Sequence, residues 1–365
     1  MVAILGAFTV IYTVHFFSGR RVASMASDKT WTFAVSGDSR NCGDLIMPAI
    51  AASAKVHDAS FYWHLGDFRA AYMIDQDMAA EPEHAGASLK LADYQEIAWQ
   101  DFIDRQLVPF TSMPVYLAMG NHELMEHTRA DYVHAFRRWL DAPAIQNARV
   151  KDGGSDVATY YHWTQGGVDF LTLDNASHDQ FDAAQMDWFR KLMARDEADP
   201  SITTIVLGMH AALPDSISFG HSMSESKSGP GIASGREVYG ELLKAQNESH
   251  KKIYLLASHS HIFMEGVFNT DYWNGHGGVL PGWIVGTAGA AWIDLPPGSN
   301  RAAKAMQRVY GYLLATVNPD GLNDGSIRFD FQLFNKGDVP SDVAQRYGSE
   351  VVDYCFERNL QTYSH

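Results

Sequence analysis

The chain has 365 residues, 46% of them hydrophobic, and its 28 Lys and Arg against 43 Asp and Glu give a net charge of −15. This length and composition exclude a disordered or peptide-sized protein and suit one large α/β domain or two ordinary ones. The dispersed acidic charge excludes a generic binder of long nucleic acid, which needs a basic face, but allows a small anionic substrate where cations reverse the local field.

An apolar segment from Val2 to Phe17 opens the chain, and two arginines follow it at positions 20 and 21. The segment is short for a membrane-spanning helix, which needs ~20 residues. Ser24 and Ala26 would be the −3 and −1 residues of a cleavage site, which indicates a signal peptide or membrane anchor over residues 1–28. The protein is then exported or attached to the cell envelope. If residues 1–28 form a buried element instead, we expect it in the cytoplasm.

From Trp31 onward, short apolar runs alternate with longer stretches of helical period, which is typical of a layered α/β domain. The runs that predict strands are, in chain order, Trp31–Ser36, Ser60–Leu65, Met113–Met119, Phe170–Leu173, Thr203–Leu207 and Lys252–Ala257. Between them, apolar residues recur every three or four positions, which predicts helices with ordinary core faces over Leu91–Phe102, Tyr132–Leu140 and Phe181–Leu192.

Three further strands are predicted towards the C-terminus, at Trp283–Gly286, Tyr312–Thr316 and Ile327–Leu333. Turn-forming residues at 317–321 separate the last two, which predicts an antiparallel hairpin. We therefore expect an α/β domain over residues 29–340, with two packed mixed β-sheets flanked by helices. A C-terminal helix or tail is expected over residues 341–365.

Polar side chains with catalytic chemistry follow five of the predicted strands. They are Asp38, Asp67, the pair Asn121 and His122, His210, and the pair His259 and His261. In an open α/β sheet, ligands gather outside the carboxyl ends of the strands, so these separate loops can converge on one point. Each residue alone is more typical of a turn or a packed histidine, and only the ordered set indicates a site.

Any metal at that point must use histidine, carboxylate and amide ligands. The two cysteines, Cys42 and Cys355, stand far apart in the sequence and provide neither a disulfide scaffold nor a Cys-rich zinc module. We expect Cys42 to be a small buried residue. Oxygen and imidazole ligands suit Zn, Fe and Mn, and one aspartate can bridge two such ions.

In the order of its motifs the chain resembles the calcineurin-like metallophosphoesterases, including the purple acid phosphatase branch. The resemblance runs from Asp38 to His261, and Gly120-Asn121-His122-Glu123 is its most specific part. It implies a four-layer sandwich of two sheets and flanking helices, and one or two Fe, Mn or Zn ions. The implied roles are Asp38 and His261 on the first metal, Asn121, His210 and His259 on the second, Asp67 as the bridge, and His122 beside the leaving oxygen.

The first motif departs from the family pattern. Arg40 stands where the family has a histidine ligand, and Ala70 stands where the acid phosphatase branch has a compensating tyrosine. Three interpretations are open. Arg40 binds the substrate phosphate and the first metal is weak or absent; a neighbouring residue (Asn41, Cys42 or Tyr72) supplies the ligand; or the site is inactive. A guanidinium can grip two phosphate oxygens but has no lone pair for a metal.

Two further residues are candidates for substrate binding. Arg69 follows Asp67 by two positions, and His221 lies in a long polar loop, where it would act as an acid on the substrate side. For both Arg40 and Arg69 the alternative is an ion pair with the aspartates.

Together these residues predict a metal-dependent phosphoesterase, in which a metal-bound water attacks the phosphorus of a phosphomonoester or small phosphodiester in line with the leaving group. Arg40 and His122 are the predicted catalytic residues, and a small phosphorylated molecule is the expected partner. A non-catalytic metal- or ligand-binding protein with a degenerate first metal site is the alternative. A nuclease or cyclic-nucleotide diesterase using the same site is a third hypothesis.

Overall fold

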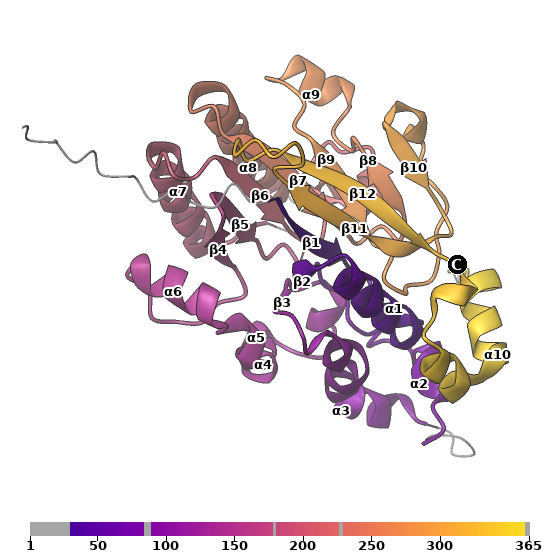
Figure 1. Cartoon of the computed structure of the whole chain (residues 1–365). Coiled ribbons are helices and arrows are strands. Elements are labelled where there is room, and N and C mark those ends of the chain that lie inside the picture. The colour runs from indigo at the N-terminus through magenta and orange to yellow at the C-terminus, as the bar shows by residue number, and fades with distance from the viewer. Residues whose placement is uncertain (1–29, 84–88, 178–179, 226–228, 362–365) are drawn as a thin grey trace, which may run out of the picture.

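Two mixed β-sheets pack face to face at the centre of the protein (Figure 1). The computed structural model describes residues 30–83, 89–177, 180–225 and 229–361. One sheet has the strand order β12-β11-β1-β2-β3. Its strands are β1 (Trp31–Ser36), β2 (Ala59–His64), β3 (Val115–Leu117), β11 (Tyr310–Val317) and β12 (Ile327–Phe334).

The second sheet has seven strands in the order β10-β8-β9-β7-β6-β5-β4. Its strands are β4 (Tyr161–Gln165), β5 (Val168–Thr172), β6 (Thr204–Gly208), β7 (Lys252–Ala257), β8 (Phe263–Glu265), β9 (Gly282–Val285) and β10 (Lys304–Met306). Each sheet contains a run of neighbouring parallel strands, β1-β2-β3 in one and β5-β6-β7-β9 in the other. Their carboxyl ends therefore carry the loops that hold the predicted ligands.

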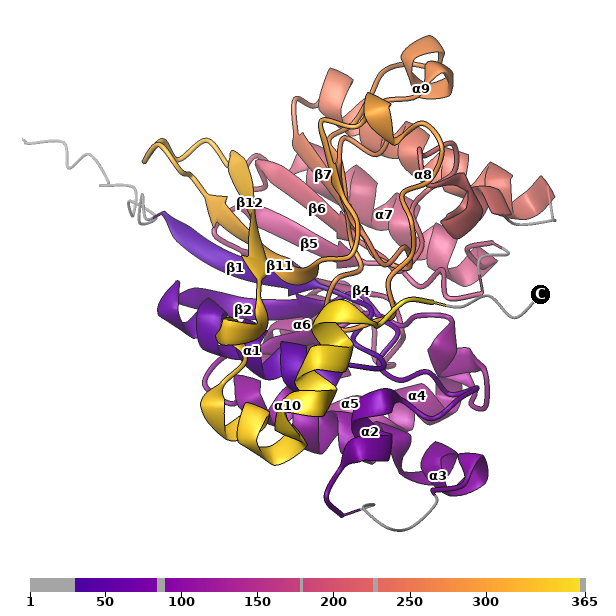
Figure 2. The same cartoon turned by 90° about the vertical axis from the view of Figure 1, so that its right-hand side faces the viewer.

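Helices cover the outer faces of both sheets and complete four layers (Figure 2). Helix α1 packs on β2 and β11, whereas α8 packs on β7 and on α7. The α-helices are α1 (Gly43–Val56), α2 (Gln76–Ala80), α3 (Leu91–Asp101), α4 (Arg129–Ala135), α5 (Arg137–Leu140), α6 (Pro143–Lys151), α7 (Ala183–Ala198), α8 (Gly229–Glu248), α9 (Asp271–Gly275) and α10 (Ser341–Glu357). A π-helical segment, η1 (Phe102–Leu107), extends α3. Short 3₁₀ segments are η2 (Val108–Phe110), η3 (His122–Leu124), η4 (Phe219–His221), η5 (Met223–Glu225), η6 (Ser299–Arg301) and η7 (Lys336–Asp338).

The predicted fold class is confirmed, and the predicted hairpin is the antiparallel pair β11–β12. Three strands were not predicted: β4, β8 and β10. All three are short and run antiparallel to their neighbours, and β4 and β10 form the sheet edges.

An aromatic layer fills the space between the two sheets. Phe33 stacks on Phe61 within the five-stranded sheet, with ring centroids 5.0 Å apart. Across the interface, Phe61 meets Phe170 edge-on at 5.1 Å, and Trp63 meets Trp163 edge-on at 5.1 Å. All five rings are fully buried, so they fix the spacing of the sheets and of the loops that leave them.

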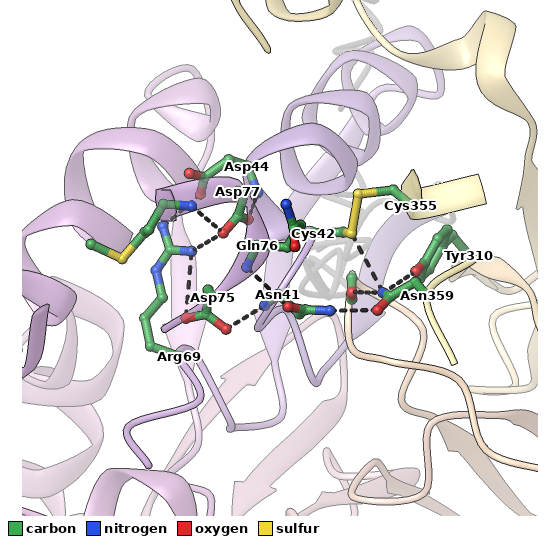
Figure 3. Close-up of a disulfide and its surroundings, with 12 residues drawn as sticks. Asn41, Cys42, Asp44, Arg69, Asp75, Gln76, Asp77, Tyr310, Cys355 and Asn359 are labelled. Atoms are coloured by element: carbon green, nitrogen blue, oxygen red, sulfur yellow. Dashed lines mark hydrogen bonds and ion pairs between the residues drawn. A yellow bond between two sulfur atoms is a disulfide. The ribbon is translucent and has the colours of Figure 1, made fainter. Parts of the chain in front are cut away.

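Helix α10 returns the end of the chain to its beginning, beside α1 (Figures 1 and 2). Cys355 of α10 forms a disulfide with Cys42, across 313 residues of sequence (Figure 3). Cys42 is buried as expected, but this bond was not predicted. The disulfide fixes the C-terminal segment next to the first motif.

The signal peptide or anchor predicted over residues 1–28 lies outside the described residues. Within the described ranges, no helix is both long enough and apolar enough to cross a membrane.

Candidate metal centre

The six predicted metal ligands come together at the carboxyl ends of the strands, three from each sheet. Asp38, Asp67 and Asn121 follow β1, β2 and β3, whereas His210 follows β6 and the pair His259 and His261 follows β7. His210 Nε2 lies 3.0 Å from Asn121 Oδ1, 3.0 Å from His259 Nδ1 and 3.3 Å from Asp67 Oδ1. The ligand atoms of Asp67, His210 and His259 all lie within 4.8 Å of one another.

Three of these residues have left-handed backbone conformations. The φ angles are 59° at Asp38, 60° at Asp67 and 63° at His259. Such values are uncommon outside glycine and cost roughly 1–3 kcal/mol each, and they concentrate at functional sites. The turns direct these residues out of the strand ends and into the shared centre.

Hydrogen bonding orients His210 for metal binding. Its Nδ1 donates to the Leu65 carbonyl oxygen at 2.9 Å, so Nε2 is the nitrogen left to face Asn121 and Asp67. An unprotonated Nε2 would place its lone pair against the oxygens of Asn121 and Asp67, and these groups repel one another. A proton on Nε2 or a cation between the three atoms removes the repulsion. Burial lowers the pKa of His210, but the Asp67 carboxylate outweighs it and raises the pKa to about 9. A proton and a metal ion therefore compete for the lone pair of His210 Nε2.

Two buried carboxylate oxygens at the centre also indicate a cation. Asp38 Oδ1 and Asp67 Oδ2 accept no hydrogen bond from any described residue. Burial raises the pKa of Asp67, but His122 and His210 outweigh it and hold the pKa well below its usual value. An ionised carboxylate oxygen that is desolvated and has no donor is costly, so Asp67, the predicted bridge to the second site, fits a cation.

The first metal site contains the Arg40 guanidinium. Arg40 Nη2 lies 3.0 Å from His261 Nε2, and His261 Nδ1 donates to the Ala291 carbonyl oxygen at 2.6 Å. Since Arg40 can only donate, it takes the Nε2 lone pair that a metal would need. His261 Nε2 also lies 3.5 Å from Asp38 Oδ1. This site therefore holds a side-chain cation.

Each of the three proposed replacement ligands has another partner in the structure. Cys42 is in the disulfide, which rules out a thiolate ligand. Asn41 bonds through its side chain to Asn359 and accepts from the Gln76 amide at 3.0 Å. Tyr72 Oη accepts from Arg40 Nη1 at 3.2 Å.

Arg69 is placed away from this centre, in disagreement with its predicted role in phosphate binding. Its side chain is 1% exposed and lies among four aspartates, which we call the acidic cage: Asp44, Asp75, Asp77 and Asp101 (Figure 3 shows the first three). The Nη2 to Asp44 Oδ1 distance is 2.6 Å, and the Nη1 to Asp77 Oδ1 distance is 3.0 Å. Arg69 is therefore in ion pairs with aspartates, which was the alternative interpretation of this residue.

His122 lies at the centre, beside Asp67. Its Nδ1 donates to the Ala70 carbonyl oxygen, and its Nε2 lies 3.5 Å from Asp67 Oδ2. Burial, with Arg40 nearby, lowers the pKa of His122 to about 4. His122 is therefore a neutral imidazole in this arrangement, with Nε2 directed at the site.

Glu123 has a role that the sequence did not assign. Its carboxylate accepts from the backbone amides of Asp67 at 2.9 Å, Phe68 at 2.8 Å and Gly120 at 2.7 Å. It therefore joins the loop after β2 to the loop after β3. The signal for this role was its place in the most specific motif.

His221 lies at the edge of the centre. Its ring centroid is 5.3 Å from that of His259, and burial, with His261 nearby, lowers its pKa to about 4. It is thus close enough to contact a substrate, and its role stays a prediction.

Comparison with known proteins agrees with this geometry. A family model described as calcineurin-like phosphoesterase matches residues 33–263, well over half of the chain. A search of curated protein sequences found no match to this chain.

Solved structures show the same fold at low sequence identity. A purple acid phosphatase, PPD1, from yellow lupin seeds has a TM-score of 0.53 at 15% identity, covering 85% of this chain and 53% of its own. PhoD has a TM-score of 0.52 at 16% identity, covering 83% of this chain and 68% of its own. A dimetal phosphatase from Danio rerio has a TM-score of 0.50 at 11% identity, covering 83% and 98%.

The chain thus spans about half the length of the lupin phosphatase, and the likeness to these structures concerns the fold. The family match covers the ordered motifs from the end of β1 to the end of β7, where the ligand atoms converge. The chain belongs to the calcineurin-like phosphoesterase family, whose members are metal-dependent phosphoesterases.

Proposed function

We propose that this protein hydrolyses a phosphomonoester or small phosphodiester with one metal ion, and that Arg40 supplies the positive charge of the missing second ion. The observation that carries this proposal is the 3.0 Å contact between Arg40 Nη2 and His261 Nε2. Burial lowers the pKa of Arg40, but Asp67, Tyr72 and Asp38 outweigh it and raise the pKa. The guanidinium therefore stays charged throughout the range in which the protein is folded.

Four residues would hold the single ion: Asp67, Asn121, His210 and His259. When bound, an Fe, Mn or Zn ion supplies Lewis-acid chemistry and a lowered pKa for water. Glu123 and the Leu65 carbonyl oxygen hold Asp67 and His210 in position through the hydrogen bonds described above.

The chain's own residues orient the substrate and move the proton. Arg40 binds equatorial phosphoryl oxygens with its planar fork and offsets the charge that builds up on them. His122 Nε2 would take up a proton from solvent and give it to the leaving oxygen, while the Nδ1 proton stays on Nδ1 and is donated to the Ala70 carbonyl oxygen. Overall, water oxygen bonds to phosphorus, the ester P–O bond breaks, and the alcohol leaves with a proton.

Loss of activity in ligand variants tests the proposal. Asp67→Asn and His210→Ala should each lower kcat/KM for 4-nitrophenyl phosphate and its bis-ester at least ~100-fold, because each removes a ligand and an orienting charge. His276→Ala, at an exposed histidine after α9, is the matched control and should keep full activity. Near-normal turnover in either ligand variant would contradict the proposal.

Metal content tests the role of Arg40. Mass spectrometry of protein purified without chelator should find one ion per chain, and Arg40→His should raise this to two, because it restores a lone pair beside His261. Two ions in the parent chain would contradict the role of Arg40. A chain that refuses added Mn, Fe and Zn would favour the non-catalytic binding protein.

A further inference from the structure

A pocket of about 400 Å³ opens beside the metal centre. We call it the His221–Trp292 pocket. Its lining comes from three segments: the loop with η4, the loop after β9, and the end of the chain beyond α10. The lining residues are Ser218, Gly220, His221, Trp292, Ile293, Asp294, Leu295, Pro296, Pro297, Leu360 and Gln361.

Three contacts join the lining of this pocket to the last metal motif. The His221 and His259 ring centroids are 5.3 Å apart. Ser218 Oγ lies 2.6 Å from Ser260 Oγ, and the carbonyl oxygen of Ala291, next to Trp292, accepts from His261 at 2.6 Å. A group attached to a phosphoryl at the metal centre would therefore extend into this pocket.

The lining is apolar and almost free of charge. Most of it is formed by Trp292, Ile293, Leu295, two prolines and Leu360, and none of the described lining residues is Lys or Arg. Its one acidic residue, Asp294, is exposed and paired with Arg308 at 3.1 Å. Such a surface favours an uncharged hydrocarbon or aromatic group and offers nothing to neutralise a second phosphate.

The segment 359–361, which forms one wall, is fixed in place by hydrogen bonds. Trp292 N donates to the Asn359 carbonyl oxygen at 2.7 Å, and Gln361 N donates back to the Trp292 carbonyl oxygen at 2.9 Å. The Asn359 side chain donates to Tyr310 Oη at 2.6 Å, near the Cys42–Cys355 disulfide (Figure 3). A wall that is held in advance loses little conformational entropy when a ligand binds.

We propose that the His221–Trp292 pocket binds the leaving group of the substrate, and that this group is an uncharged, largely apolar alcohol. This inference rests on the proposed function, since it places the phosphoryl at the metal centre. Because the described lining residues include no Lys or Arg, we expect nucleoside polyphosphates and nucleic acid strands to be poor substrates.

Binding of two phosphonates to the Mn-loaded protein tests the pocket without turnover. Calorimetry should show that benzylphosphonate binds at least about tenfold more tightly than methylphosphonate, because the ring buries apolar surface. Leu360→Ala should lower this ratio about two- to fivefold. Leu360 is 44% exposed, so its truncation will not unfold the chain, and Leu322→Ala, at a 64% exposed leucine between β11 and β12, should leave the ratio unchanged.

The outcomes separate the two proposals. Equal affinities for the two phosphonates, or a ratio that Leu360→Ala leaves intact, would overturn the pocket assignment while leaving the metal centre standing. Failure of both phosphonates to bind would count against the proposed function and against the pocket that depends on it.

Discussion

Glu123 shows how one buried side chain can hold together two loops of the candidate metal centre. The carboxylate is 1% exposed, and its three backbone donors come from the turns that carry Asp67 and Asn121. Those donors would otherwise be buried and unpaired, and Asp67 has a left-handed φ of 60° that must be held by its surroundings. Glu123 thus stabilises a turn that the chain alone would not favour.

We expect Glu123→Gln to destabilise the fold and the metal site together. The amide NH₂ replaces one acceptor and faces a backbone donor, which costs about 1–3 kcal/mol of unfolding free energy. Loss of such a supporting bond should weaken metal affinity about 10–100-fold. Urea unfolding and titration with Mn would measure the two effects.

Glu126→Gln is the control for that variant, because Glu126 is exposed three residues further along the same segment. In Glu126→Gln, the free energy of unfolding and the affinity for Mn should both stay at their parent values. Unchanged metal affinity in Glu123→Gln would show that the two loops hold their shape without this carboxylate.

At the level of single residues, the sequence predicted which candidate ligands converge, but it misplaced Arg69. Asp38, Asp67 and the histidines could be predicted because strand ends meet at one edge of each sheet. The position of Arg69 could not be predicted from its neighbours, because its four aspartate partners come from segments around α1, α2 and α3, and only the tertiary fold brings them together.

Several helices meet at the acidic cage. Arg69 pairs with Asp44 in α1, Asp77 in α2 and Asp101 in α3. The Tyr347 hydroxyl of α10 lies 2.9 Å from Asp44 Oδ2 and 2.5 Å from Glu81 Oε1, and it donates its one proton to either of them. Arg105 and Arg346 in turn pair with Glu81. The four aspartates and Glu81 thus face three arginines, so carboxyl groups outnumber the cations in this buried cluster.

The contribution of this cluster to folding stability should therefore fall as pH rises from about 4 to about 7. Burial raises the pKa of Asp101 to about 7, with Asp44 and Glu81 adding to the effect, and burial likewise raises the pKa values of Asp75 and Asp77. A carboxyl that keeps its proton in the folded state but loses it near pH 4 when unfolded makes unfolding easier as pH rises. The slope is about 1.4 kcal/mol per pH unit for each proton released on unfolding.

Urea unfolding from pH 5 to 8 would test this through the difference between the parent and Asp101→Asn. The variant cannot release that proton, so its free energy of unfolding should fall less steeply between pH 5 and 7. Burial raises the pKa of Glu81, but hydrogen bonds from Arg346 and Tyr347 outweigh it and lower the pKa. Glu81 therefore makes the fold more stable as pH rises, and it does so equally in the parent and in the variant. Asp104→Asn, at an exposed aspartate in η1, is the control, and parallel curves for Asp101→Asn and the parent would contradict the prediction.

At the level of elements, regular patterns were predictable and long-range connections were not. Strands with a run of buried apolar residues, such as β1 and β7, were predicted with the bounds that the structure has. Strands β8 and β10 have three residues each, too few for a periodic signal. The Cys42–Cys355 disulfide depends on the return of α10 to α1, which no local pattern encodes.

Over the whole molecule, the metal centre depends on how the two sheets are spaced. Asp38, Asp67 and Asn121 follow strands of one sheet, and the three histidines predicted as ligands follow strands of the other. Gly208, the last residue of β6, lies against the Trp63 indole of β2, where a Cβ atom would overlap the ring. Trp63 is itself fully buried against Trp163, so it has no free space into which it can move.

Gly208→Ala should therefore push the sheets apart at the point where His210 leaves β6. Overpacking of this kind costs about 1–3 kcal/mol of unfolding free energy, and metal affinity should fall with it because His210 is two residues away. Gly240→Ala is the matched substitution: this glycine lies inside α8 with open space around it, so alanine should raise the unfolding free energy by about 0.5–1 kcal/mol and leave metal affinity unchanged. Two results would contradict this prediction: the same change in unfolding free energy for both variants, or a Gly208→Ala variant that binds metal with the affinity of the parent. Either would mean that the sheets can separate without moving the candidate ligands.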